Sequence, residues 1–186
     1  YYVGRLSTTD AYQTDGSKEV LEQRDGVGID RFTGGAANRA KFDMEVLTSG
    51  EFNTSIQIRN FELWQLGIAL QSIQDMLDGF VRIGFGKSRG LGKIKGKISG
   101  LHIYYFGKNK PEKDDEIWGI GKFENGYGYD ADSDIVIVDE SITPVKRGLR
   151  FQYDIPVTQI DRIMNKLNES FIKKAETYKR FADFRN

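Results

Sequence analysis

The 186-residue sequence contains no cysteine, one histidine and three prolines. The lack of cysteine excludes disulfides and thiolate metal ligands, and it fits a reducing cytoplasm. One histidine is too few for the usual zinc sites, so we expect no metal site. No apolar run reaches the roughly 18 residues of a membrane span, and there is no signal-peptide pattern. We therefore expect a cytoplasmic protein that does not interact with a membrane.

The chain as a whole is neutral, with 27 basic and 27 acidic side chains, but its charge is concentrated locally. Residues 81–97 contain five glycines, six lysines or arginines and no acid. Such a cluster creates a local positive field that favours an anionic partner. Glycines allow backbone N–H groups to approach an anion without a Cβ in the way. The segment therefore predicts binding to a phosphate backbone.

Two standard phosphate-binding motifs can be compared with this segment by spacing. A P-loop needs a glycine five positions before Gly86-Lys87-Ser88, where this chain has Val81. The dinucleotide fingerprint needs a third glycine where this chain has Arg89. The observed spacing is Gly-x-Gly-x-x-x-Gly-x-Gly, with Lys-Ser-Arg in the middle. A nucleotide-binding protein with a degenerate P-loop stays as an alternative.

Two stretches of the sequence resemble one known family. Residues 84–93 (GFGKSRGLGK) resemble the glycine-rich loop of the RAMP superfamily of CRISPR-associated proteins. Residues 28–43 (GIDRFTGGAANRAKFD) resemble the Ile-Asp-Arg-x-Thr-Gly-x-Ala segment of the backbone subunits in type III effector complexes. The resemblance covers roughly residues 25–100, and the chain beyond about residue 110 matches no family that we can name.

The resemblance implies a palm-and-thumb subunit whose thumb, about residues 14–41, folds over guide RNA and wedges between guide and target. Ile29 or Phe32 would then press on a splayed base. We expect Asp30 to cap a turn or pair with an arginine. The residues expected to contact RNA are Arg31, Arg39, Lys41, Gly84, Gly86, Lys87, Ser88, Arg89, Gly90, Lys93 and Lys95.

Periodicity predicts the elements around the loop. Residues 14–28 and 29–40 are predicted loops, and residues 42–46 and 52–58 form a predicted hairpin. A helix is expected from an N-cap at Asn60 to Gly79. A long strand is expected over residues 91–106, where Lys93, Lys95 and Lys97 would share one face.

The order strand, helix, glycine loop, strand predicts an α+β class with half of a ferredoxin-like (RRM-like) RAMP fold. Only one strand-like run precedes Asp10, so we expect this fold to be incomplete at the N-terminus. Residues 1–106 would form the core, with the glycine-rich loop at 84–92. Residues 107–186 would add an irregular insertion over 107–133, a short strand over 135–138 and a long amphipathic helix opening at Thr158 that packs on the core.

Two further candidates for chemistry are weaker. His102 could be a general base, but it lies in an apolar strand with no catalytic partner nearby in sequence, which favours a structural role. Asp130, Asp132 and Asp134 resemble a metal loop, but the EF-hand glycine and glutamate are missing, so a solvated acidic loop is expected.

The resemblance thus implies a type III effector backbone subunit that binds guide RNA, and it leaves open whether this subunit contributes to target RNA cleavage in the complex. Its partners would be guide RNA, target RNA and other CRISPR effector subunits. The family's catalytic aspartate has no counterpart here, so neither Asp10 nor Asp15 is assigned that role. No cofactor is identifiable, and a divalent metal is expected only if the chain cleaves RNA. The enzymatic alternative is a stand-alone RNA-processing endonuclease that uses His102.

Overall fold

The computed structural model describes residues 4–123 and 134–182, and over residues 177–182 it describes the backbone alone. The chain divides into two compact units, residues 1–58 and 59–186. The fold is α+β, as predicted, and the described residues form several small antiparallel sheets and two α-helices. The predicted division of the chain near residue 106 stays a prediction. Neither described helix has the length and apolar character that a membrane crossing requires.

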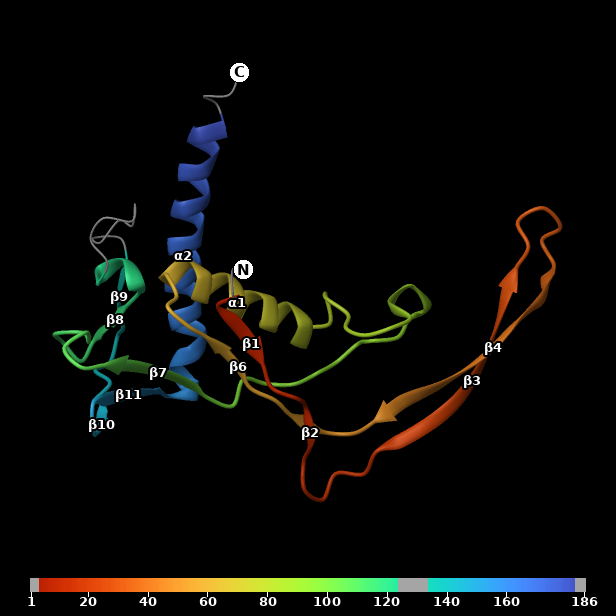
Figure 1. Ribbon diagram of the computed structural model, residues 1–186, viewed down its shortest axis with the longest axis horizontal. Helices are drawn as coiled ribbons and strands as arrows, with labels where there is room; N and C mark the ends of the chain where they lie inside the picture. The colour runs from red at the N-terminus through yellow and green to blue at the C-terminus, as the bar shows by residue number, and fades with distance from the viewer. Residues whose placement is uncertain (1–3, 124–133, 183–186) are drawn as a thin grey trace. The chain divides into compact units, whose positions relative to one another are not determined.

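The first unit is one long antiparallel hairpin, seen as a twisted ribbon in Figure 1. The chain runs out along three strands and returns along three more, so that β1 pairs with β6, β2 with β5 and β3 with β4. The outgoing strands are β1 (Leu6–Thr8), β2 (Tyr12–Gln13) and β3 (Val20–Ile29). The returning strands are β4 (Ala36–Ser49), β5 (Phe52–Asn53) and β6 (Ile56–Ile58).

This pairing corrects two predictions. The strand that contains residues 42–46 pairs with β3 rather than with residues 52–58, and much of the segment predicted as loops over 14–40 is strand. The pairing has a packing reason: Gly26 lies opposite Phe42, whose ring occupies the space that a Cβ at Gly26 would take. Gly26, one of the glycines that predicted a loop, therefore makes room for a cross-strand aromatic ring.

Helix α1 (Leu63–Leu77) matches the predicted helix except at its start. The N-cap is Glu62, which forms a capping box with Gln65, and not Asn60, which has a left-handed φ of 48°. The helix ends as predicted: Asp78 is the C-cap and Gly79 follows with a φ of 81°. Leu63, Leu66 and Leu70 are buried along one side.

The second helix, α2 (Val157–Ala182), has the predicted apolar stripe, in which Ile160, Ile163 and Leu167 are buried. The same unit contains a three-stranded sheet of order β10-β11-β7 and a separate pair, β8 and β9. These strands are β7 (Leu101–Phe106), β8 (Glu116–Trp118), β9 (Ile135–Ile137), β10 (Val145–Arg147) and β11 (Arg150–Ile155). β9 confirms the predicted short strand, whereas β8 lies in the segment expected to be irregular.

The predicted long strand over residues 91–106 is confirmed only for residues 101–106. Residues 91–100 have no regular secondary structure. The segment is interrupted by glycines, and Gly92 has a left-handed φ of 82°, which an extended strand does not accommodate. Lys93, Lys95 and Lys97 therefore do not form a stripe on a strand.

Helices α1 and α2 cross in Figure 1, and Gly67 of α1 lies where the two backbones approach closely. A Cβ at this position would lie 2.7 Å from the backbone oxygen of Leu167 on α2. Nearby, the rings of Trp64 and Phe171 stack with centroids 6.4 Å apart, and Asn168 Nδ2 donates a hydrogen bond of 3.0 Å to Gln71 Oε1. Packing between the two helices thus requires glycine at position 67, although glycine has a low helix propensity.

We expect Gly67→Ala to destabilise the protein by about 1–3 kcal/mol, because the new methyl group would push the helices apart. Helix propensity alone predicts the opposite, a gain of about 1 kcal/mol. Thermal and denaturant unfolding would measure the change. Ser72→Ala, at an exposed position of the same helix, is the control and should change stability by less than about 0.5 kcal/mol. A higher melting temperature for Gly67→Ala would contradict the close helix crossing.

Candidate nucleic-acid interface

The glycine-rich loop owes its shape to four left-handed residues. Gly84, Gly86, Gly90 and Gly92 have φ values of 75°, 74°, 89° and 82°. Side chains with a Cβ rarely adopt this conformation, so each glycine of the Gly-x-Gly-x-x-x-Gly-x-Gly pattern has a backbone reason. The spacing therefore encodes a particular loop geometry and is not a general sign of flexibility.

Hydrogen bonds close this loop at its base and its tip. The Ile83 amide donates to the Gly92 carbonyl at 2.9 Å, and the approach is so close that a Cβ at Gly92 would collide with the Ile83 oxygen. At the tip, residues Lys87–Arg89 form a single 3-10 turn in which the Arg89 amide donates to the Gly86 carbonyl at 2.8 Å. The Arg82 guanidinium donates to the Lys87 carbonyl at 3.2 Å.

The tip of the loop presents its polar side chains to solvent. Lys87, Ser88 and Arg89 are all exposed, and the ring of Phe85, between Gly84 and Gly86, is exposed as well. No ion pair connects Lys87 to a carboxylate within residues 4–123 and 134–182. The predicted loop residues from Gly84 to Gly90 are thus brought together at one surface where an anion has access.

The lysines after the loop extend this surface in a different way from the predicted stripe. Lys93 and Lys95 are exposed, and the aliphatic part of Lys93 lies against Gly79 at the end of α1. Leu77 of α1 lies against Gly96, where a Cβ would come within 2.9 Å of its side chain. The returning segment is therefore held by the C-terminal end of α1 and leaves the lysine ammonium groups in solvent.

The tip of the β3–β4 hairpin is organised by Asp30. Its carboxylate accepts hydrogen bonds from the amides of Phe32 at 2.7 Å and Thr33 at 2.9 Å, and its carbonyl accepts one from Gly34. The Thr33 and Phe32 amides together lower the pKa of Asp30. Asp30 thus caps a turn, as expected. The turn leaves the Phe32 side chain 99% exposed and Arg31 exposed beside it.

Arg39 lies at an irregularity of the hairpin. The register shifts between Val27, opposite Lys41, and Ile29, opposite Ala36, so extra residues of β4 bulge out of the pairing. Arg39 in this bulge has a φ of 58°, an uncommon conformation for a residue with a side chain. Lys41, also predicted to contact RNA, lies 3.5 Å from Asp25 Oδ2, so its charge is partly compensated.

Sequence comparison now supplies the family. A sequence model of the RAMP superfamily matches residues 3–95, which are 93 of the 186 residues, half of the chain. The chain belongs to the RAMP superfamily. At the level of the family, this is a CRISPR-associated RNA-binding protein. A comparison with curated proteins found no match. The matched segment includes the hairpin, α1 and the glycine-rich loop, which are the elements described above.

Asp134, one of the three acids that we predicted in a solvated loop, has a different role in this RAMP protein. Asp134 is buried: its Oδ1 accepts a hydrogen bond from the Leu63 amide and its Oδ2 accepts one from Gly121, each at 2.8 Å. It therefore ties the first turn of α1 to the residues before β9. Asp130 and Asp132 lie outside the described residues, and the described residues contain no acidic or histidine cluster suited to a metal.

His102 faces outward from β7 and does not enter the core as a structural histidine would. Its Nδ1 lies 2.5 Å from Asp154 Oδ1, and about half of each side chain is exposed. Hydrogen bonds from Gln152 and His102 lower the pKa of Asp154. Sequence reasoning missed this pair because Asp154 lies on β11, whose antiparallel register with β7 places it directly opposite His102.

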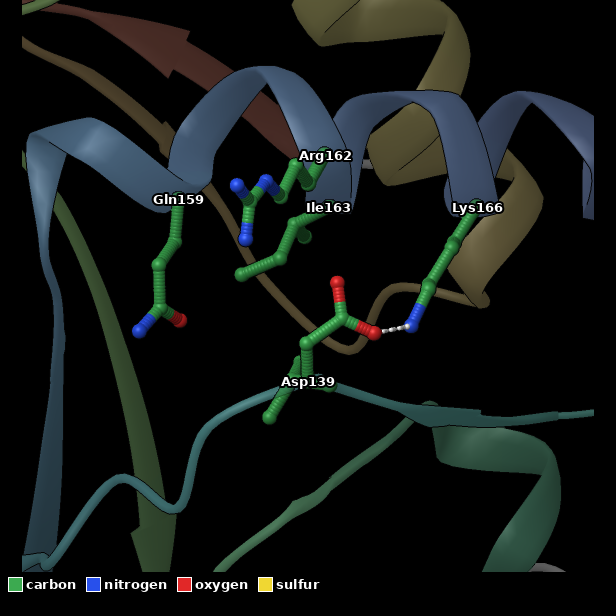
Figure 2. Close-up of a pocket in the computed structure, with 6 residues that line it drawn as sticks. Asp139, Gln159, Arg162, Ile163 and Lys166 are labelled. Atoms are coloured by element: carbon green, nitrogen blue, oxygen red, sulfur yellow. Dashed lines mark hydrogen bonds and ion pairs between the residues drawn. The ribbon is translucent and has the colours of Figure 1, made fainter.

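A shallow depression of this RAMP protein lies between α2 and the chain after β9 (Figure 2). The side chains of Gln159, Arg162 and Ile163 point toward it, and an ion pair of 2.6 Å joins Lys166 Nζ to Asp139 Oδ1 across it. This contact lowers the pKa of Asp139. Because Lys166 and Asp139 pair with each other across it, we do not consider the depression a candidate for the RNA site.

Burial raises the pKa of Asp134, and its hydrogen bonds with the Leu63 and Gly121 amides offset this only in part. The folded state therefore holds this proton more tightly than the unfolded chain, so the associated stability is present below about pH 3.9 and is lost as pH rises through the folded pKa. We expect Asp134→Asn to lack this loss of stability. Unfolding free energies measured by denaturant from pH 3 to 7 would test the difference.

The control for this experiment is Asp134→Ala, which leaves the Leu63 and Gly121 amides without acceptors at every pH. It should cost about 2–4 kcal/mol throughout the range. Parallel pH profiles for the wild type and Asp134→Asn would contradict the raised pKa.

Proposed function

We propose that this RAMP protein is a backbone subunit of a type III CRISPR effector complex that binds guide RNA through the glycine-rich loop and the hairpin tip. The observation that carries the proposal is the loop geometry: four left-handed glycines hold the exposed side chains of Lys87, Ser88 and Arg89 together at the loop tip. Because the protein as a whole is neutral, the positive cluster at this loop is where an anionic chain would be attracted.

The loop suits contact with an RNA backbone of any sequence. Lys87 and Arg89 would neutralise phosphates, while Ser88 and the loop amides would add neutral donors. Lys93 and Lys95 would continue the contact along the strand of RNA. Because these groups recognise phosphate and not base edges, binding would be independent of sequence, as a guide-binding subunit requires.

The hairpin would act as the thumb. Its tip combines an exposed aromatic ring, Phe32, with the cations Arg31 and Arg39, and this is the composition that stacks on a splayed base while holding the adjacent phosphates. The uncommon backbone of Arg39 supports a functional role, because residues in sparsely populated backbone conformations cluster at functional sites. The expected result is a wedge between guide and target RNA.

In the assembled complex this subunit would contact target RNA and other effector subunits, and it would contribute to target cleavage if a catalytic aspartate and a divalent metal are supplied. No residue of this chain is assigned that role. The proposed location is the cytoplasm, where transcripts are available.

The nucleotide-binding alternative is disfavoured by the local geometry. A P-loop places phosphates at the start of a helix that continues from the loop. Here the residues Lys87–Arg89 form one 3-10 turn, and the chain then continues without regular structure to residue 100.

We expect the double variant Lys87→Ala/Arg89→Ala to weaken binding to single-stranded RNA by about tenfold or more, equally for unrelated sequences. The slope of log K against log salt should fall by about 1–2 units, because about two phosphate contacts are lost. Fluorescence anisotropy over a salt series would measure both. The melting temperature should stay unchanged, because both side chains are exposed.

The matched control is Lys113→Ala/Arg162→Ala, which removes two positive charges from exposed positions outside the loop. It should leave the affinity within about twofold and should barely change the salt slope. Equal losses in both double variants would show that net charge, and not the loop, determines binding.

A second candidate function, RNA cleavage by the chain alone, is favoured by the contact of His102 with Asp154, because a carboxylate can orient a histidine that acts as a base. If this function holds, purified protein should cleave repeat RNA without partners, His102→Ala should abolish cleavage, and Asp154→Asn should slow it and shift its pH profile. Gel analysis of labelled RNA would measure the products. Intact RNA, or cleavage that persists in His102→Ala, would exclude this candidate.

A further inference from the structure

The outward face of the sheet β10-β11-β7 lies in the part of the chain beyond the residues matched to the family. Side chains of β7 alternate between the two faces: Ile103 and Tyr105 are buried, whereas His102, Tyr104 and Phe106 are exposed. The two faces of this sheet therefore differ: side chains on one face are buried in the core, and aromatic side chains on the other face are exposed to solvent.

Two aromatic rings of β7 expose a large fraction of their surface. Tyr104 is 43% exposed and Phe106 is 62% exposed, two positions apart on the same face of β7. Large rings exposed as a neighbouring pair are typical of a surface that contacts a partner. The guanidinium of Arg150, on β11, lies 5.2 Å from the centroid of the Tyr104 ring.

The charge on this face is positive. Arg150 of β11 is paired in register with Phe106 of β7, and Arg147 of β10 is paired with Arg150 from the other side of β11. Among the described residues of these three strands, the one acid is Asp154, and its Oδ1 already accepts hydrogen bonds from Gln152 Nε2, at 2.7 Å, and interacts with His102. The acid is thus compensated, while the arginines add positive charge around the rings.

We propose that this face, formed by Tyr104, Phe106, Arg147 and Arg150, is a second binding surface for single-stranded RNA, on which unpaired bases stack. The inference rests on the proposed function only in taking RNA as the partner; it requires neither the glycine-rich loop nor the thumb. Exposed aromatic residues at alternate positions of a sheet stack successive bases, and arginines beside them hold the phosphates.

Charge complementarity decides between RNA and a protein as the occupant. Aromatic rings surrounded by arginines match a ligand that has flat bases and one negative charge per nucleotide. An apolar protein surface would leave the guanidinium groups buried without acceptors, at a cost in free energy. RNA would provide bases that stack on the rings and phosphates that pair with the guanidinium groups.

The test compares the full-length wild type with Tyr104→Ala/Phe106→Ala for binding to fluorescein-labelled polyuridine and polyadenine RNA. Loss of two stacking rings should weaken binding by about tenfold or more while leaving the salt slope unchanged, because no phosphate contact is removed. Ultraviolet crosslinking of 4-thiouridine RNA, read by mass spectrometry, should yield adducts on β7 in the wild type. Tyr104→Phe/Phe106→Tyr keeps both rings and should retain the affinity.

The outcomes separate this inference from the proposed loop function. If Lys87→Ala/Arg89→Ala has no effect but the aromatic double variant binds RNA weakly, the loop function fails and this surface stands. If the aromatic variant binds RNA like the wild type, with an unchanged melting temperature, the inference is overturned. It is also overturned if the aromatic variant binds RNA normally but loses self-association in sedimentation, which would identify a contact between copies of the chain.

Discussion

Helix α1 is the element on which the second unit depends, and it is fixed along its whole length by contacts with other segments. Asp134 accepts a hydrogen bond from its first turn, Gly67 allows its middle to touch the backbone of α2, and Leu77 near its end packs against Gly96. An ion pair of 3.4 Å between Lys174 and Glu62 adds a further link at the N-cap. Because the glycine-rich loop starts directly after this helix, a rigid α1 gives the loop a fixed origin.

The loop itself combines two requirements that are usually met separately. Its backbone must turn through left-handed conformations, which needs glycine, and it must present cations, which need long side chains. Alternating the two residue types satisfies both, with Lys87, Ser88 and Arg89 placed between the glycine pairs. The pattern explains why neither the P-loop nor the dinucleotide spacing fits this loop, for which we propose phosphate binding as well.

The hairpin unit and the sheet β10-β11-β7 show a common use of antiparallel pairing. Both carry an exposed aromatic ring with an arginine near it: Phe32 with Arg31 in the turn between β3 and β4, and Tyr104 of β7 with Arg150 of β11. The hairpin belongs to the segment that matches the RAMP superfamily, and the sheet does not. If both contact RNA, the unmatched part of the chain extends the binding surface of the family with its own chemistry.

The sequence by itself determined the properties that depend on near neighbours. Helical periodicity located α1 and α2, and the glycine spacing located the loop, because a helix stripe and a left-handed turn are set by residues within a few positions of one another. Only the tertiary structure decided which strands pair, where β7 begins, that Asp134 is buried and that His102 meets Asp154. These features depend on segments far apart in the chain. The sequence alone does not show whether a carboxylate is surrounded by water or accepts hydrogen bonds from two buried backbone amides.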